Sequence, residues 1–600
     1  MIDLGEFALW MALPLAVWGS GAAFLGGARN RSDFVYSAER SAYATTILLM
    51  VAAAGLGAAL VGDRFELAYV HLHSAAEFPP AVKWSALWAG EEGALLVRLL
   101  GLSLATSLSV WMYKGRLGGL MPWTTGVLQA LVATLVVILL VGVSPFARLG
   151  YMPADGMGAA WGVGSPWAVI HAPALHLGMG AIAVPFALAV STLLTGKGGG
   201  RWADPATDWA LIAWVFLTVA LLARARWAYE VAAQGEIWTW DPAEAVLLAT
   251  WLATSAVLYV LGAAGGAGSR RLVGLALAGT AFGVSWVALT VTRTGFGVAG
   301  PELTDRAGPE GLLLVLLAGV VVMPALLLLH RLPLLRDGQD RGASAGVGRG
   351  RDGAGIILAI WAVGIAWGAL LPILAETLHG SPVTVGAGYF RWLSAAMLLL
   401  LLGVASLSAR RGREEAGPLD APADGGGLGN VGAEVRRWGG RLVHVGFVVA
   451  LLGGVGTAMG VEALVRMMPG DSVLLTSPLG REYALGYEGT SLRPGPGGWS
   501  WVSLLSVRRS GAPMGTITTE RRVTSLEGGG SATPGILTRP LEDLHIRLEE
   551  VDERLGTLND PEFQGATFLV RVNPLASWIW LGGILMGVGG LLSVHGRRVE

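Results

Sequence analysis

Two kinds of side chain in this sequence are candidates for chemistry: histidines in apolar segments, and tryptophans next to acids. His171 and His176 open one apolar run, and His444 lies inside another, in Leu442-Val-His-Val-Gly446. A histidine inside lipid is costly, which makes it a functional candidate, and a neutral imidazole is a good axial ligand for haem iron. His444 is therefore predicted to ligate a metal or a cofactor.

The tryptophans gather in a few segments that also hold glycine, acids and proline. The chain has 24 of them, and two such segments read Lys83-Trp-Ser-Ala-Leu-Trp-Ala-Gly-Glu-Glu-Gly93 and Ile237-Trp-Thr-Trp-Asp-Pro242. Tryptophan favours the headgroup layer of a membrane, so an aromatic belt explains scattered examples. A flat aromatic surface also suits a planar apolar ligand with a polar edge. Composition alone leaves both interpretations open.

Charged residues near these segments have simpler roles. Arg98 stands about two turns after Glu91 and Glu92, and we expect it to pair with them, or alternatively with a bound propionate. Asp241 precedes Pro242 and is expected to cap a helix. The sequence contains no recognisable nucleotide loop, zinc motif or Ser/His/Asp constellation.

The composition indicates that a membrane holds these residues. Of the 600 residues, 53% are hydrophobic and only 14% charged, and the mean hydropathy is +0.58. A soluble multidomain chain would be about a quarter charged, so that class and disorder are excluded. A net charge of −1 argues against a nucleic-acid partner. The absence of cysteine excludes disulfides, Fe–S clusters and cysteine nucleophiles.

Thirteen apolar windows are long enough to span a bilayer, which needs about 20 residues. No cleavable signal peptide is predicted, because the first window lacks a basic leading region. The windows are about 5–28, 41–62, 88–113, 124–143, 167–195, 208–226, 240–262, 270–292, 311–330, 354–374, 389–409, 439–460 and 575–595.

Basic residues predict the orientation of these spans. Lys and Arg number 22 in one set of alternate loops and 7 in the opposite short loops, and basic loops face the cytoplasm. The N-terminus is therefore expected outside, the C-terminus in the cytoplasm, and the tryptophan-rich loops outside.

The expected fold is an all-α polytopic membrane protein of about 13 transmembrane helices, with a small extracytoplasmic β domain before the last helix. Alternating, β-rich segments broken by Gly and Pro predict that domain. The expected parts are a transmembrane core with the outer loops (1–410), a cytoplasmic linker (411–438), a span carrying His444 (439–460), the β domain (461–574), and the final span with a cytoplasmic tail (575–600).

Several segments, in order along the chain, resemble the CcmF family of cytochrome c-type haem lyase subunits, whose outer loops carry a tryptophan-rich WWD motif. The matching segments are Trp88-Ala-Gly-Glu-Glu-Gly-Ala-Leu-Leu96, Ser144-Pro-Phe-Ala-Arg148, His171-Ala-Pro-Ala-Leu-His176, Ala213-Trp-Val-Phe-Leu-Thr218, Trp227-Ala-Tyr229, Trp238-Thr-Trp-Asp-Pro-Ala-Glu244, Thr292-Arg-Thr-Gly295 and Val572-Asn-Pro-Leu-Ala-Ser-Trp-Ile-Trp-Leu-Gly-Gly583.

The resemblance implies a function in cytochrome c biogenesis. Such proteins attach haem to the thiols of a Cys-x-x-Cys-His motif in apocytochrome c, outside the bacterial cytoplasmic (inner) membrane. A CcmE-like haem chaperone delivers that haem, other maturation subunits of the CcmH type take part, and a second, structural haem b sits in the membrane. The missing cysteines agree with this, because the reacting thiols belong to the substrate.

The resemblance also assigns roles to residues. His171 matches an outer histidine that ligates the transient haem, His444 matches a membrane histidine that ligates haem b, and Trp238, Trp240 and Asp241 match the tryptophan motif. These residues are the expected catalytic and iron-binding set. The rest of the expected haem site comprises Trp84, Trp88 and Trp161 as platform, with Arg148, Arg226 or Arg293 meeting the propionates.

The chain departs from the family pattern at five positions. Gln234 and Ile237 stand where tryptophans are expected, and Ala245 where an asparagine is expected. Tyr259 replaces the first membrane histidine, and Pro301 the second outer histidine. These losses keep an alternative open, a haem-binding or haem-delivery assembly subunit without lyase activity.

Depth along the helix gives Tyr259 a further candidate role. It follows Asp241 by 18 residues, about 27 Å at 1.5 Å per residue, which takes it to the inner side of the membrane. His444 enters from that side and reaches a similar depth. A haem there is expected to be held by His444 with Tyr259, by His444 alone, or with His330 or His595 as substitutes. An ordinary interfacial aromatic is the simpler account of Tyr259.

Overall fold

A computed structural model describes thirteen stretches of the chain, and the structural statements below concern these residues. They are 1–142, 144–158, 165–196, 201–232, 236–262, 268–293, 310–337, 347–380, 383–415, 428–495, 498–523, 532–551 and 565–599.

Thirteen helical segments of the described chain are long and apolar enough to cross a membrane, which confirms the expected number. One of them, Pro166–Thr195, is divided between two helices at Ile182. The spanning helices are α1 (Ile2–Arg29), α2 (Ser32–Val61), α5 (Glu91–Tyr113), α6 (Leu120–Val141), α7 (Pro166–Ala181), α8 (Ala183–Thr195), α9 (Ala203–Trp227), α10 (Pro242–Leu261), α11 (Gly268–Arg293), α12 (Glu310–Asp337), α13 (Val347–His379), α14 (Ala387–Glu415), α15 (Leu428–Ala458) and α16 (Ala576–Val599).

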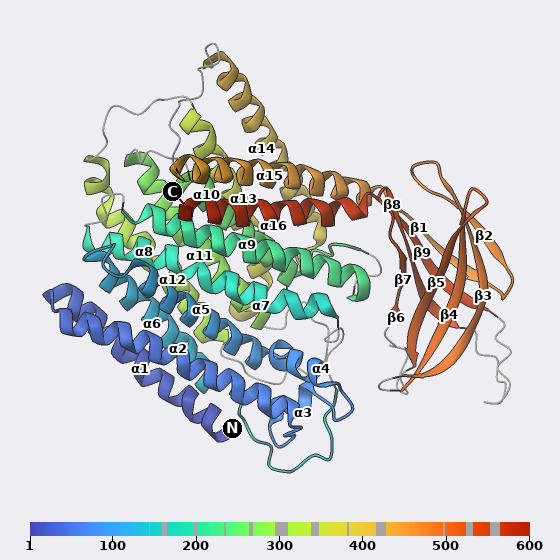
Figure 1. Ribbon diagram of the computed structural model, residues 1–600, viewed down its shortest axis with the longest axis horizontal. Coiled ribbons are helices and arrows are strands. Elements are labelled where there is room, and N and C mark those ends of the chain that lie inside the picture. The colour runs from blue at the N-terminus through green and yellow to red at the C-terminus, as the bar shows by residue number, and fades with distance from the viewer. Residues whose placement is uncertain are drawn as a thin grey trace.

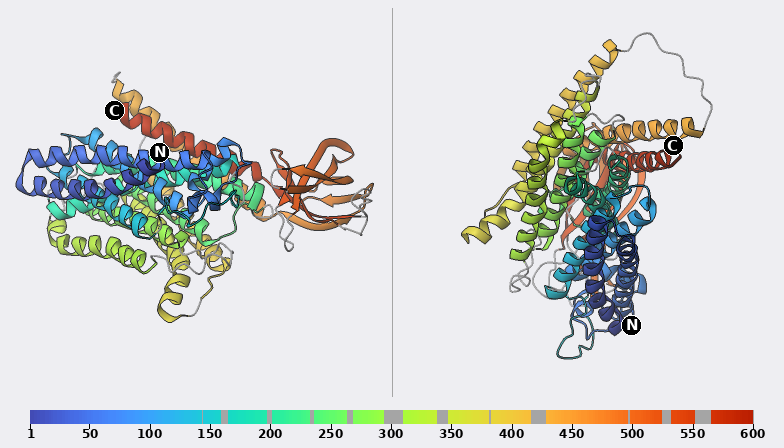
Figure 2. Two further views of the ribbon diagram at one scale, coloured as in Figure 1. Left: turned by 90° about the horizontal axis from the view of Figure 1, so that it is seen from below. Right: turned by 90° about the vertical axis from the view of Figure 1, so that its left-hand side faces the viewer.

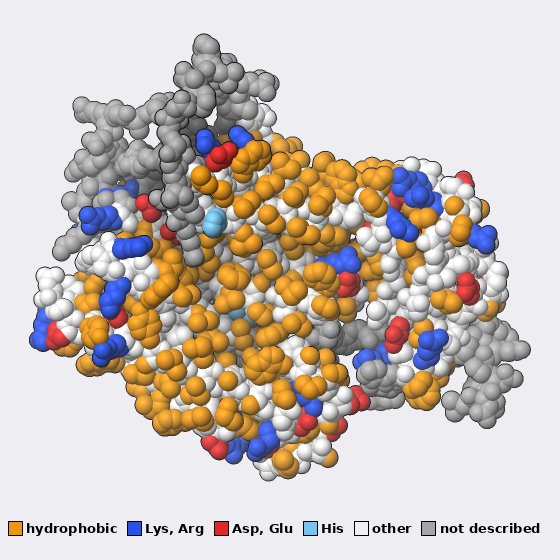
Figure 3. Space-filling model, in the orientation of Figure 1, with side chains coloured by type: hydrophobic (Ala, Val, Ile, Leu, Met, Phe, Trp, Pro, Cys, Tyr) orange, Lys and Arg blue, Asp and Glu red, His pale blue; other side chains and the backbone are white. Residues whose placement is uncertain are grey.

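The helices lie side by side in one elongated bundle, and the strands form a separate body at one end of it (Figure 1). Apolar side chains cover the middle of the bundle, while charged side chains gather towards its two ends and on the β domain (Figure 3). This distribution is that of a multi-pass membrane protein, because the uncharged band faces lipid and the charged ends face water.

Short helices shape the end of the bundle that carries the tryptophan-rich segments. They are α3 (Ala68–His73), α4 (Pro80–Ser85), η1 (Ala86–Trp88) and the π-helix η2 (Ala228–Ala232), which continues α9. Tyr69 anchors the first three, since its hydroxyl donates to the Ala86 carbonyl at 2.8 Å and accepts from the Gly90 N–H at 3.1 Å. The α3 and α4 end is the end that carries the β domain (Figure 1).

The β domain is a pair of antiparallel sheets, and it confirms the expected fold class. One sheet has the order β1-β9-β8-β7 and the other β2-β3-β4-β5-β6. Tyr487 and Phe568 meet between the sheets with ring centroids 5.1 Å apart. The strands are β1 (Val461–Met467), β2 (Ser472–Thr476), β3 (Glu482–Gly495), β4 (Gly498–Arg509), β5 (Ala512–Val523), β6 (Ala532–Thr533), β7 (Gly535–Leu537), β8 (Glu542–Val551) and β9 (Ala566–Pro574).

Helices α15 and α16 form a close antiparallel pair that carries the β domain (Figures 1 and 2). Glycines make the approach possible: a Cβ on Gly446 would stand 2.5 Å from the carbonyl oxygen of Gly582, and one on Gly589 2.6 Å from that of Gly439. The helix that carries His444 begins at Leu428 and α14 ends at Glu415. The expected linker 411–438 is thus helical at both ends, because the apolar pattern alone does not mark where a polar helix end begins.

Candidate functional site

The tryptophan motif packs against a buried phenylalanine of a neighbouring helix. Trp238 and Trp240 meet edge to face, with ring centroids 5.9 Å apart and an interplanar angle of 82°. Trp240 also stacks on Phe390 of α14 at 5.8 Å and 6°. The backbone of Trp240 has a φ of 62°, a left-handed conformation that turns the chain immediately before α10. The motif and α14 are distant in sequence, so Phe390 was not a candidate from the sequence.

Asp241 caps α10, as expected, and belongs to a small polar network. Its Oδ1 accepts from the backbone N–H of Glu244 at 2.9 Å. Thr239 donates from its backbone N–H and its hydroxyl to Glu244, at 2.9 and 2.8 Å. The network holds the tryptophan-bearing segment rigidly on the first turn of α10.

Arg224 is the cation at the centre of this network, and the sequence interpretation missed it. Its Nη2 lies 3.0 Å from Asp241 and 3.1 Å from the buried carboxylate of Glu244. Its guanidinium also stands 5.0 Å from the centre of the Trp227 ring. An arginine in the last turn of an apolar helix was the available signal, but its partners lie beyond a loop and could not be identified from spacing.

His171 lies close to the same cation and is held in one tautomer. Its Nδ1 donates to the carbonyl oxygen of Ala220 on α9 at 2.9 Å. The lone pair is therefore on Nε2, which is the arrangement of a metal-ligating histidine. Arg224 is near enough for its charge to act on the imidazole. The structure thus places His171 against α9 one turn before Arg224, the cation that pairs with Asp241.

Trp84 and Trp88 belong to a second aromatic group on the same end of the bundle. Trp84 is 45% exposed and lies directly over Gly57 of α2, while Trp88 packs partly buried against the main core. No ring contact between described residues joins this group to Trp238 and Trp240. Trp161 lies outside the described residues.

The expected propionate-binding arginines are engaged elsewhere or not described. Arg148 forms an ion pair with Asp3 and a β-bridge with Leu67, which ties the 144–148 segment to the N-terminal helix. Arg226 pairs with Glu230 at 2.7 Å. The side chain of Arg293 is not described, and Gln234 and Pro301 lie outside the described residues.

The expected pairing of Arg98 with Glu91 and Glu92 is wrong. Arg98 donates to the carbonyl oxygen of Ser285 on α11 at 3.0 Å and contacts the sulfur of Met179 on α7. The side chain extends across the bundle to α7 and α11, where the sequence could not place a partner.

Tyr259 and His444 meet at the other end of α10, which is one of the arrangements that their similar depth left open. The Tyr259 hydroxyl lies 3.2 Å from Nε2 of His444, and Nδ1 of His444 donates to the Gly440 carbonyl at 2.7 Å. The Nε2 lone pair is therefore directed at the tyrosine hydroxyl. No hydrogen bond or ring contact between described residues links His330 or His595 to this pair.

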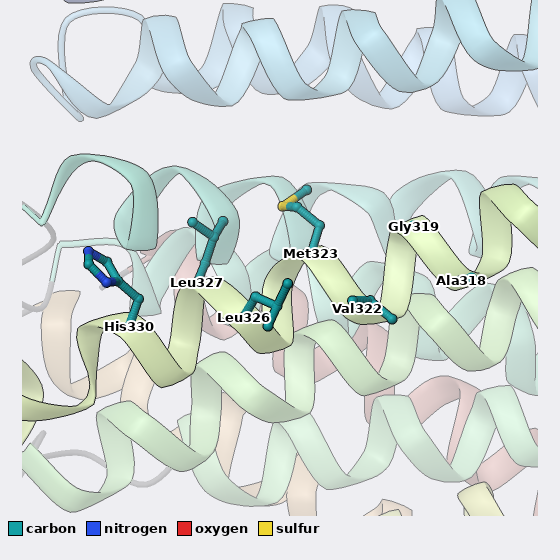
Figure 4. A pocket seen from close by; sticks show the side chains of 7 residues that line it. All are labelled: Ala318, Gly319, Val322, Met323, Leu326, Leu327 and His330. Atoms are coloured by element: carbon teal, nitrogen blue, oxygen red, sulfur yellow. The ribbon is translucent and has the colours of Figure 1, made fainter.

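A separate apolar hollow follows α12 and ends at His330 (Figure 4). Its volume is about 630 Å³, and it is lined by Ala318, Gly319, Val322, Met323, Leu326, Leu327 and His330. All of these come from a single helix whose side chains are largely exposed, so the hollow is part of the lipid-facing surface. Among the described residues, no three His, Asp or Glu side chains are grouped so that they could hold a metal ion.

The β domain contacts the membrane core through Tyr229 of η2. The Tyr229 hydroxyl donates to Asp543 at 3.4 Å and accepts from the Asn573 side chain at 3.3 Å. His545 Nε2 donates to the Tyr229 carbonyl at 3.2 Å, and Trp580 of α16 lies against the same ring at 6.1 Å. Burial raises the pKa of Asp543 to about 6 and lowers the pKa of His545 to about 4. Two family-like segments, Trp227-Ala-Tyr229 and Val572–Gly583, therefore meet here.

Comparison with known proteins agrees with this arrangement. Residues 96–296 match the model of the family described as "Cytochrome C assembly protein". The chain is 28% identical to the cytochrome c-type biogenesis protein CcmF of Pseudomonas aeruginosa, across 99% of this chain and 96% of that protein. It is 26% identical to the biogenesis protein NrfE of Haemophilus influenzae, across 99% of each.

A solved structure shares the fold. The chain superimposes on the structure named "Cytochrome c Heme Lyase CcmF" with a TM-score of 0.76 and 20% identity, covering 99% of this chain and 97% of that one. Over nearly its whole length the chain is thus similar in sequence to CcmF-type cytochrome c biogenesis proteins, and it shares the fold of the solved CcmF structure.

Proposed function

We propose that this protein acts in cytochrome c biogenesis as part of a haem lyase system, binding haem at its outer end and presenting it to apocytochrome c. The observation that carries the proposal is the position of His171. Its tautomer is fixed with Nε2 as the ligating nitrogen, next to the Arg224 network that supports Trp238 and Trp240.

In this proposal the protein orients its substrate and supplies no nucleophile. Nε2 of His171 ligates the haem iron, and a surface formed by Trp238 and Trp240, with buried Phe390 behind Trp240, packs against the porphyrin. The Asp241–Arg224–Glu244 network keeps that surface in place. The thiols of a Cys-x-x-Cys-His motif then add to haem vinyl groups, so orientation is the main contribution to the rate.

The second haem of the family, haem b within the membrane, fits His444 and does not fit the present His444–Tyr259 pair. The Tyr259 hydroxyl lies 3.2 Å from Nε2 of His444, a hydrogen-bond distance that leaves no room for an iron between the two atoms. His444 is thus the residue that would ligate the iron, with Tyr259 moving away or staying as a hydrogen-bond partner. Bound there, haem b would supply electrons to the outer haem.

The proposed setting is the bacterial inner membrane, with the N-terminus outside and the C-terminus in the cytoplasm. Arg and Lys are concentrated in the loops at the end opposite the β domain, which supports this orientation. The proposed partners are apocytochrome c, a CcmE-like haem chaperone and a CcmH-like maturation subunit, all of which would meet the β-domain end.

One observation favours the alternative, a haem-delivery subunit without lyase activity. Ile237, next to Trp238, occupies a position where the family motif has a tryptophan, so the aromatic surface is smaller. Both proposals require bound haem, and they differ in whether thioether bonds are formed on haem held at His171.

The deciding experiment uses His171→Ala in cells that depend on this protein for cytochrome c maturation. We expect loss of covalent haem in cytochrome c, while the purified variant keeps any haem bound at His444. Purified His444→Ala should lose the haem bound at His444 and keep the ability to bind haem at His171, because the two sites lie at opposite ends of the bundle. His379→Ala, at an exposed histidine, is the control.

Unchanged maturation by His171→Ala would favour haem delivery without lyase activity. Purified wild-type protein that binds no haem at all would contradict both proposals.

A further inference from the structure

Arg98 places a positive charge deep in the helix bundle without a negative partner. The residue is 8% exposed, and its contacts are the carbonyl oxygen of Ser285 and the sulfur of Met179. Neither group carries charge. In the described part of the chain, no carboxylate forms an ion pair with it. A buried guanidinium in a membrane protein is costly unless an anion compensates it.

A second buried polar group lies next to this charge. His176 is also 8% exposed, and its Nδ1 is buried with no hydrogen-bond partner among the described residues. The two side chains are close enough for their charges to interact. A buried polar atom without a partner is rare in proteins and calls for a physical reason. A carboxylate at this position would accept hydrogen bonds from both residues.

We infer that Arg98 and His176 form a binding site for a carboxylate, and that its occupant is a haem propionate. The inference rests on the proposed function. His176 follows His171 by five residues, which places it about 7.5 Å deeper along α7. A haem whose iron lies at His171 can therefore direct a carboxylate inward, towards Arg98, whose planar fork suits carboxylates.

This site would decide which way the haem faces. The propionates and vinyl groups lie on different edges of the porphyrin. With the propionates directed into the bundle, the vinyl groups face outward, where the thiols of an apocytochrome arrive. Arg98 is thus assigned as a positioning residue that acts through the substrate's orientation.

The test compares haem with its dimethyl ester, in which both carboxylates are blocked. We expect purified wild-type protein, titrated by absorbance, to bind the free acid about 10- to 100-fold more tightly, the range for a lost charge-assisted hydrogen bond. Equal affinity of the wild type for both compounds would overturn the inference, whatever any variant does. If neither binds, the proposed function itself fails.

Variants locate the carboxylate site. Arg98→Met should abolish the preference for the free acid, whereas Arg64→Met should keep it, since Arg64 is an exposed outer arginine paired with Glu66. His171→Ala should change the haem spectrum and keep the preference. Arg148→Met should also keep the preference for the free acid. If Arg148→Met loses that preference while Arg98→Met keeps it, the propionate lies at Arg148 and the inference is overturned.

Two further measurements distinguish a propionate site from a fatty-acid site and from a purely structural arginine. Laurate, a carboxylate without a porphyrin, should compete weakly; if it displaces haem completely at Arg98, a fatty acid is the occupant and the inference is wrong. Without haem, Arg98→Met should melt at or above the wild-type temperature, because an uncompensated charge is removed. A lower melting temperature with an unchanged preference for the free acid would indicate a structural role and overturn the inference.

Discussion

At the scale of single residues, Asp241 joins local helix capping to the aromatic site. One carboxylate oxygen caps α10, and the other pairs with Arg224. Asp241→Ala removes both interactions, so we expect a loss of about 1–2 kcal/mol of stability and a lower melting temperature in detergent. Asp241→Asn keeps a capping oxygen and should lose less.

Asp33→Ala is the matched control, because Asp33 also stands in the first turn of a helix but its ion pair with Arg31 is exposed. Its effect on the melting temperature should be much smaller than that of Asp241→Ala, because an exposed ion pair contributes little to stability. Equal losses for Asp33→Ala and Asp241→Ala would show that the network around Arg224 adds no stability.

At this scale, the sequence predicts the features that depend on residues near each other along the chain. The cap at Asp241 follows from neighbouring residues, and the similar depth of Tyr259 and His444 follows from the regular rise of a helix. Their contact was one of several arrangements that this depth allowed. The contacts of Phe390 and Arg98 depend on how helices pack across the bundle, so no spacing rule could supply them. The thirteen spans were predictable because lipid requires long apolar helices.

At the scale of elements, glycines determine how α15 and α16 pack. Membrane helices approach closely where small residues face each other. In Gly446→Ala, the added methyl would stand 2.5 Å from the Gly582 carbonyl oxygen, and the helices must separate. We expect a loss of about 1–3 kcal/mol, the usual cost of overpacking, measured as a lower melting temperature in detergent.

Gly454→Ala provides the control on the same helix, since a Cβ there would meet nothing within 4 Å. It should be neutral or raise stability by up to about 1 kcal/mol through better helix propensity. Similar destabilisation by both changes would mean that helix propensity, and not the contact with α16, sets the effect.

At the scale of the whole molecule, two buried groups with opposite pH responses hold the β domain on the membrane core. Burial raises the pKa of folded Asp543 to about 6, so the folded residue keeps a proton that the unfolded chain loses near pH 3.8. The stability that Asp543 contributes to the fold therefore falls as pH rises from 4 to 6. Burial lowers the pKa of folded His545 to about 4, so above pH 4 the folded histidine is neutral, whereas the unfolded histidine stays protonated up to about pH 6.5. The stability that His545 contributes to the fold therefore rises with pH over this range.

The two trends should cancel in the wild type and be exposed by single substitutions. The melting temperature of Asp543→Asn should rise between pH 4 and 6.5, and that of His545→Gln should fall between pH 4 and 6. The differences between the folded and unfolded pKa correspond to roughly 3 kcal/mol of stability for each of the two residues. The double variant supplies the baseline for all other titrating groups, and parallel profiles for the two single variants would contradict the account.

The way the β domain is attached has a mechanical consequence. Strand β1 follows α15, strand β9 precedes α16, and these strands pair with each other from Val461–Val572 onward. The helix pair and the strand pair thus form one continuous double segment from the bilayer into the water. A partner protein that displaces the β domain would therefore tilt α15. Because α15 also carries His444, docking at one end of the molecule would change the distance between His444 and Tyr259 at the other end.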